Sequence, residues 1–96
     1  MKISEISLQI VKDYCGISDS DSDEIIENVM IPSAKSFILG YTGLSSEQIE
    51  KYEDFAFALL ILVNDMYSNR EYTLNVNRQV NPAVKTLLGM HSVNYL

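Results

Sequence analysis

The sequence has a single cysteine, Cys15, and a single histidine, His91. A lone cysteine cannot form an internal disulfide, and a lone histidine has no second one with which to build a metal site. We therefore interpret Cys15 as a small core residue and His91 as a surface or packing residue. Residues 1–5 include no apolar stretch of the kind that a secretion signal needs, so we expect a protein made for a reducing cytoplasm.

Motifs for catalysis and for phosphate binding are also missing. The sequence contains no phosphate-cradling glycine loop, no Cys or His set at metal-ligand spacing and no serine nucleophile elbow. The carboxylate pairs Asp54 with Asp65 and Glu50 with Glu53 are predicted to lie on solvent faces, where nothing equips them for acid–base chemistry. We expect no enzymatic activity, no cofactor and no bound metal.

Basic residues, glycine and proline are scarce. Seven Lys and Arg against 13 Asp and Glu give a net charge of −6, which disfavours binding to phosphate backbones and to anionic membranes. Four Gly and two Pro are too few for a linker-rich chain, and a hydrophobic share of 47% is typical of a globular protein. The 96 residues are predicted to form one domain, residues 1–96.

The longest hydrophobic run, Phe55 to Val63, is the centre of the predicted fold. Its nine residues are too few to cross a bilayer, which needs roughly 18 or more. We predict a buried central helix over residues 46–69, started by Ser45 or Ser46. Its broad apolar face comprises Tyr52, Phe55, Ala56, Leu59, Leu62, Val63, Met66 and Tyr67. Phe57 and Ile61 lie on the opposite face and need a second partner, either another helix of the same domain or a neighbouring copy.

Three further helices are predicted over residues 4–14, 22–41 and 82–88, the first starting at Ser4 or Ser7, which gives an all-α fold class, a small bundle of about four helices. Gly16 and Gly43 are expected to end the first two, and Asn81-Pro82 to open the last. The apolar face of the 22–41 helix comprises Ile25, Ile26, Val29, Met30, Ala34, Phe37, Ile38 and Tyr41. Pro32 lies inside this helix, where proline removes a hydrogen bond, so we expect a kink or a split there.

Residues 18–24 alternate serine and acid, with aspartates at positions 19, 21 and 23 as at the start of a calcium-binding EF-hand loop. That loop needs Gly at its sixth position and Glu at its twelfth, where this sequence has Glu24 and Met30. The same residues are explained by the start of a helix, because Ser and Asp side chains cap free amide groups. Asp21 with Glu24, or Ser20 with Asp23, has the spacing of a capping pair.

Two segments are predicted to be extended. In residues 71–80 apolar and polar residues alternate, as in a lone loop or a strand that pairs with something outside the chain. The tail, residues 90–96, is a plausible arm for a neighbouring molecule. Arg70 is expected to bind the carbonyls at the end of its helix or the carboxylate of a neighbour. The predicted protein-interface residues are Phe57, Ile61, Arg70, Leu74, Val76, Val80, Val93 and Tyr95.

Three motifs, taken in order, resemble the head-tail connector (adaptor) family of tailed phages. They are Tyr41-Thr42-Gly43, Met66-Tyr67-Ser68-Asn69-Arg70-Glu71 and Asn81-Pro82-Ala83-Val84-Lys85-Thr86-Leu87-Leu88. The resemblance covers nearly the whole chain. The sequence departs from the family at Pro32, in a helix that is usually uninterrupted, and at Gly89-Met90-His91, where the family more often has proline and an aromatic residue followed by arginine.

The resemblance implies a structural virion assembly protein without catalytic activity. Similar proteins form a homo-oligomeric ring under the portal protein, extend the DNA channel and offer a surface to tail-completion proteins. The implied location is the head-tail junction of the virion, after assembly in the cytoplasm of the bacterial host, with DNA passing without specific binding. The residues alone leave two alternatives open, namely a small acidic interaction module of regulatory or antitoxin-like type and an enzyme subunit whose site is completed on assembly.

Overall fold

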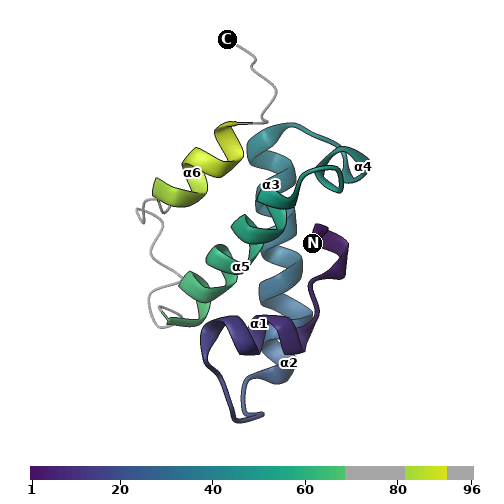
Figure 1. Cartoon of the computed structure of the whole chain (residues 1–96). Coiled ribbons are helices and arrows are strands. Elements are labelled where there is room, and N and C mark those ends of the chain that lie inside the picture. Colours follow the sequence, from purple (N-terminus) through teal and green to yellow (C-terminus); the bar gives the residue numbers. More distant parts are fainter. Residues whose placement is uncertain (69–81, 91–96) are drawn as a thin grey trace.

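The computed structural model describes residues 1–68 and 82–90, and every regular element in this part of the chain is a helix (Figure 1). This confirms the predicted all-α fold class. The elements in chain order are η1 (Ile3–Glu5), α1 (Leu8–Cys15), α2 (Asp23–Ile25), η2 (Ile26–Met30), α3 (Ile31–Thr42), α4 (Ser46–Ile49), α5 (Glu53–Ser68) and α6 (Pro82–Gly89). The predicted loop at residues 71–80 and residues 91–96 of the predicted tail lie outside the described residues.

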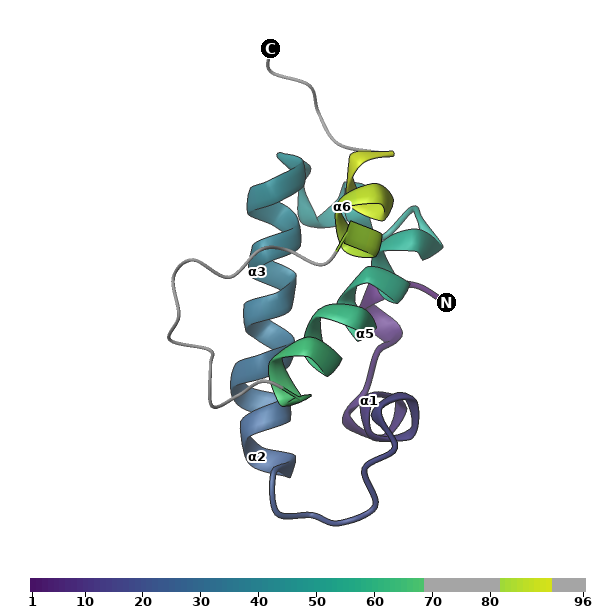
Figure 2. The same cartoon turned by 90° about the vertical axis from the view of Figure 1, so that its left-hand side faces the viewer.

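Helix α5 lies at the centre of the bundle and contacts η1, α1, η2, α3 and α6 (Figures 1 and 2). Phe55, Leu59 and Val63 on its predicted core face have no exposed surface. Ala58 and Leu60, outside that predicted face, are buried as well. Because neighbours flank α5 on several sides, the buried part of its surface is wider than a single amphipathic stripe predicts.

Residues 23–42 form one rod in which α2, η2 and α3 follow one another (Figures 1 and 2). The middle segment, η2, is a π-helix, and the Ile31 N–H at its end donates to the Ile26 carbonyl five residues back. Proline in an ordinary α-helix collides with the carbonyl four residues before it, and the wider π turn relieves that conflict. Pro32 thus sits in the first turn of α3, and where a kink or a split was predicted the helix changes its type.

The apolar face predicted for this rod was partly wrong. Ile25, Val29 and Tyr41 were assigned to the core, yet their side chains are 50%, 55% and 43% exposed. The buried side chains repeat mainly every fourth residue and are Ile26, Met30, Ile31, Ala34, Ile38 and Thr42. This narrow stripe suffices to bury the rod against the core, because α5 covers only one side of it. Residues next to the stripe are rotated by about 100° around the helix and so face solvent.

Glycine ends two helices as predicted. Gly16 and Gly43 have φ values of 74° and 73°, in the left-handed region that glycine adopts without a steric penalty. Behind Gly16, the Ile17 N–H donates to the Lys12 carbonyl at 2.9 Å. Before Gly43, the buried Thr42 hydroxyl donates to the Ile38 carbonyl at 2.7 Å and accepts from the Leu44 N–H at 3.2 Å. The Tyr-Thr-Gly motif therefore has a structural role as a helix end.

The helix predicted over residues 46–69 is interrupted. Ser45 caps α4 in a reciprocal pair with Gln48, as the sequence indicates, but α4 ends at Ile49 and α5 begins at Glu53. The Lys51 N–H bonds to the Gln48 carbonyl three residues back, at 3.2 Å, which tightens the chain into a turn. The sequence contains no glycine or proline at this break, so local rules could not place it.

The segment predicted as a helix over residues 4–14 is divided into η1 and α1, and Ser7 is the predicted start that the structure uses. Ser7 begins α1, where its side chain accepts a hydrogen bond from the Ile10 N–H at 3.3 Å. Ile3 and Ile6, on either side of the end of η1, are both buried in the core. The division lets the N-terminal segment turn along α5 while α1 keeps its own apolar face inward.

The acidic loop does not contain the predicted capping pair. Ser22 precedes α2 without a side-chain cap, and the Asp21 N–H donates to Asp19 Oδ1 at 3.0 Å. The carboxylate of Asp23 instead faces the Lys12 ammonium, 2.8 Å away on α1. Within residues 1–68 and 82–90, no group of three His, Cys, Asp or Glu side chains could hold a metal ion.

Candidate interaction surfaces

The first candidate surface is an aromatic pair formed by Phe57 of α5 and Tyr14 of α1. Their rings meet edge to face, with centroids 6.3 Å apart and planes at 90°. Phe57 is 50% exposed and Tyr14 is 42% exposed. Helix α1 therefore covers one side of Phe57, and the rest of this ring faces outward from the central helix. We call Phe57 and Tyr14 the aromatic pair.

Ile61 lies one turn after Phe57 but differs from it in burial. Its side chain is half-buried and packs against the hydrophobic core. Phe57 and Ile61 therefore do not form the equally exposed pair that the four-residue spacing suggested. The remaining residues predicted for an interface lie outside the described part of the chain: Arg70, Leu74, Val76, Val80, Val93 and Tyr95.

A second surface, which the sequence analysis did not identify, lies on the outer side of the rod. Ile25 and Val29 are four residues apart across the junction of α2 and η2, and both are at least half exposed. The neighbouring side chains of Glu24, Glu27 and Asn28 are exposed too. The sequence held one signal for this surface: Pro32 indicates a disturbed helix, for which a regular helical wheel is a poor guide.

A third apolar contact lies on α3, where the rings of Phe37 and Tyr41 stack. Their centroids are 5.7 Å apart and their planes are at 23°. Tyr41 is 43% exposed, while Phe37 is half-buried against the core. Since the inner ring supports the outer one, we interpret this stack as a local surface contact of a single helix.

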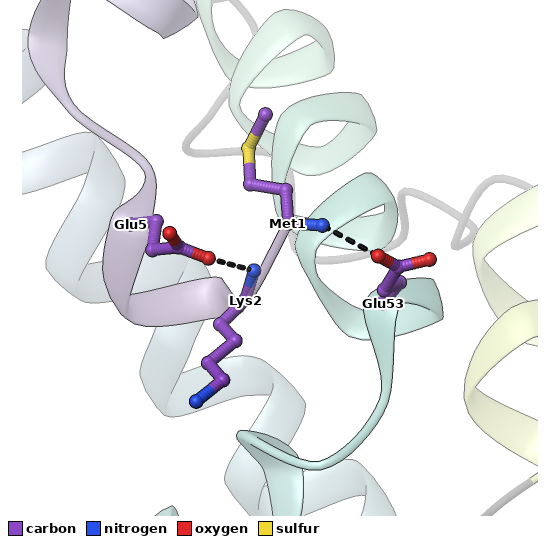
Figure 3. Close-up of polar contacts among 4 residues, drawn as sticks. All are labelled: Met1, Lys2, Glu5 and Glu53. Carbon is purple, nitrogen blue, oxygen red and sulfur yellow. Dashed lines mark hydrogen bonds and ion pairs between the residues drawn. The ribbon is translucent and has the colours of Figure 1, made fainter.

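The N-terminal segment is held against the junction of α4 and α5 by carboxylates. The Met1 ammonium lies 2.7 Å from Glu53 Oε1, and the Lys2 N–H donates to Glu5 at 2.6 Å (Figure 3). Nearby, Ser4 donates to Glu50 from its N–H at 2.8 Å and from its hydroxyl at 2.6 Å. These bonds fix η1 at the start of the central helix.

Glu53 is exposed to solvent as predicted, but these contacts give it a partner that the sequence analysis did not expect. The hydrogen bond from the Met1 ammonium lowers the pKa of Glu53, and the same bond raises the pKa of the ammonium. Both groups are open to solvent, so salt screens their attraction and the pair adds little stability. The sequence could not show the pair because its partners lie 52 residues apart.

The Lys12–Asp23 ion pair and the Cys15 thiol both have structural roles. Lys12 and Asp23 form their ion pair with side chains only 11% and 33% exposed, so it ties α1 to the start of α2. Cys15 is half-buried against the core, and its desolvation raises the pKa of the thiol. A thiol that holds its proton is a poor nucleophile, which agrees with the interpretation of Cys15 as a packing residue.

The described residues thus leave large apolar side chains exposed on several helices. No helix in residues 1–68 or 82–90 combines the length and apolar character needed to span a membrane.

Comparison with protein families gave a match over residues 5–91 to the family model described as phage gp6-like head-tail connector protein. No curated protein and no solved structure matched the chain.

Proposed function

Because the chain belongs to the phage gp6-like head-tail connector family, we propose that it assembles as one domain into a ring under the portal protein of the capsid. Family membership itself makes the chain a structural connector component of a phage virion. In the proposed role the ring extends the DNA channel and joins a tail-completion protein, after assembly in the host cytoplasm. The observation that carries the proposal is the family match over residues 5–91.

The exposed aromatic pair supports a ring. In a ring every subunit contacts its neighbours head to tail, so each copy needs two different contact surfaces. Phe57 is 50% exposed on the central helix of the domain, and aromatic side chains are enriched where proteins bind one another. We assign Phe57 to one of the two contacts, with Ile61 as its partly buried support.

The second contact is assigned to segments on either side of α6. By their sequence, Arg70, Leu74, Val76, Val80, Val93 and Tyr95 supply apolar and cationic side chains for it. The net charge of −6 also suits the role, since the wall of a DNA channel should repel phosphate rather than hold it. The proposed activity is assembly alone, with neither catalysis nor specific DNA binding.

Native mass spectrometry of the chain mixed with its cognate portal protein tests this function. The expected result is a complex in which many copies of the chain are bound to one portal ring, at a fixed stoichiometry. A mixture in which portal and chain stay separate at micromolar concentration, or bind at one copy per ring, contradicts the proposal. The portal ring alone and the chain alone are the controls for self-association.

A further inference from the structure

The exposed surface on the outer side of the rod has a distinct composition. Ile25 and Val29 are 50% and 55% exposed and lie next to each other, with Glu24 and Glu27 exposed beside them. Single exposed apolar residues are ordinary, and these two form a small apolar centre rimmed by polar side chains, the arrangement that contact sites have on a larger scale. We call Ile25 and Val29 with Glu24 and Glu27 the acid-flanked patch.

The charges around the patch determine what can bind it. Every charged residue from Asp13 to Glu27 is acidic. The cation that precedes them, Lys12, is already paired with Asp23 at 2.8 Å. An acidic partner would be repelled from this end of the molecule, whereas a partner that carries positive charge beside apolar side chains would be attracted. The aromatic pair of a second copy does not meet this requirement, because Asp13 and Asp54 are close to it in sequence.

One stretch of this chain has the complementary composition. Residues 69–81 contain both arginines of the sequence, Arg70 and Arg78, against one acid, Glu71. The stretch therefore carries a net charge of +1, from 2 − 1, whereas the other residues sum to −7, from −6 − 1. The apolar residues Leu74, Val76 and Val80 lie between and beside the arginines.

We propose that residues 69–81 of one copy dock on the acid-flanked patch of the next copy, an inference that rests on the proposed ring and leaves the tail residues Val93 and Tyr95 to meet Phe57. The arginines face Glu24 and Glu27, and the apolar side chains cover Ile25 and Val29. A ring requires each copy to contact the next, which favours a second copy as the donor. Since both ends of the 13-residue stretch continue into one domain, its middle reaches about 20 Å at most, so donor and acceptor are immediate neighbours.

Disulfide trapping tests the contact with two singly substituted chains, both carrying Cys15→Ser. One has Val29→Cys and the other Val76→Cys, and the two are mixed and oxidised, free and with portal protein. The expected product is a covalent dimer of the two chains. A matched control replaces Val29→Cys by Ser36→Cys, on an exposed position of α3, and should give at least ten times less dimer. Equal trapping at both positions, or none at Val29→Cys in either mixture, overturns the inference.

The same segment could instead cover the patch of its own chain, because the C-terminal end of α5 lies near η2 (Figures 1 and 2). A chain with both Val29→Cys and Val76→Cys, oxidised at high dilution, separates the two arrangements. Our inference expects little internal disulfide in this chain. Nearly complete internal closure, without dimer in the mixed sample, overturns it.

Charge reversal supplies an independent readout. Glu24→Arg with Glu27→Arg should weaken dimer trapping several-fold, and Arg70→Glu with Arg78→Glu in the partner chain should restore it. Restoration is the decisive result, because a merely structural effect of Glu24→Arg with Glu27→Arg would not be repaired from a second molecule.

If trapping fails while native mass spectrometry still shows many copies on the portal, this inference is wrong and the proposed function stands. Trapping without portal binding supports the contact between copies and overturns the proposed function.

Discussion

Two phenylalanines on α5, two residues apart, give a comparison in which chemistry is constant and burial differs. Phe55 has no exposed surface, whereas Phe57 is 50% exposed and touches Tyr14 edge to face. We predict that Phe55→Ala destabilises the domain strongly and that Phe57→Ala does so weakly. The contrast separates the core-forming side of the central helix from its outward side.

The magnitudes follow from burial. Removing a fully buried phenylalanine costs about 3–5 kcal/mol, a large share of the roughly 5–15 kcal/mol that stabilises a small domain. For Phe57, half of a burial term of about 1.5–3 kcal/mol is about 1 kcal/mol, and the edge-to-face contact adds about 0.5–1.5 kcal/mol. Phe57→Ala should therefore lower stability by about 2 kcal/mol, roughly half the effect of Phe55→Ala or less.

Urea unfolding followed by the helical circular dichroism signal measures both differences. Phe57→Ala should retain the full helical signal and lose about 8–16 °C in Tm, at about 4–8 °C per kcal/mol for a domain of this size. Phe55→Ala should lose more than that or unfold at 37 °C. Equal losses for the two variants would show that Phe57 is part of the core, and its assignment to a contact between copies would be refuted.

Two further predictions concern glycines and pH. Gly16→Ala should destabilise the fold by about 1–2 kcal/mol, because φ at residue 16 is +74° and alanine is strained there. Gly40→Ala should instead stabilise the fold by up to about 1 kcal/mol, because residue 40 lies inside α3 with free space around the added carbon. Thermal unfolding of the two variants checks these opposite signs. The lowered pKa of Glu53 means that its pairing with the Met1 ammonium stabilises the fold above the ordinary glutamate range and that this contribution is lost as pH falls through the lowered pKa. The pKa of the Met1 ammonium is raised, so the stabilisation by this pair is also lost as pH rises through the raised pKa. An NMR titration of Glu53 in low salt follows the loss at acid pH. A titration midpoint of Glu53 at the ordinary glutamate value contradicts the pairing.

Much of the fold follows from local rules applied to the sequence. The apolar run from Phe55 to Val63 marks the central helix, and the structure buries most of it. Gly16, Gly43 and Ser45 end or begin helices where their conformational and capping preferences place them. These features depend on residues close in sequence, so no knowledge of the tertiary contacts is needed to predict them.

The features that sequence reasoning missed depend on tertiary geometry. The π-helix before Pro32 changes the helical phase, so a regular wheel placed Ile25 and Val29 in the core although they are exposed. The carboxylates of Glu50 and Glu53 seemed idle because their partners, Ser4 and Met1, lie about 50 residues away in sequence. The contacts of Glu50 and Glu53 were therefore invisible to rules that compare residues only a few positions apart.

The central claim is that α5 holds the domain together with its buried side and joins copies through Phe57. Assembly of Phe57→Ser on the portal, measured by native mass spectrometry, tests this claim most directly. Tyr41→Ser is the control, since Tyr41 is 43% exposed on another helix and its loss removes a comparable ring from the surface. We expect that Phe57→Ser stays folded and loses the ring while Tyr41→Ser keeps it. A folded Phe57→Ser that assembles like the unsubstituted chain would contradict the claim.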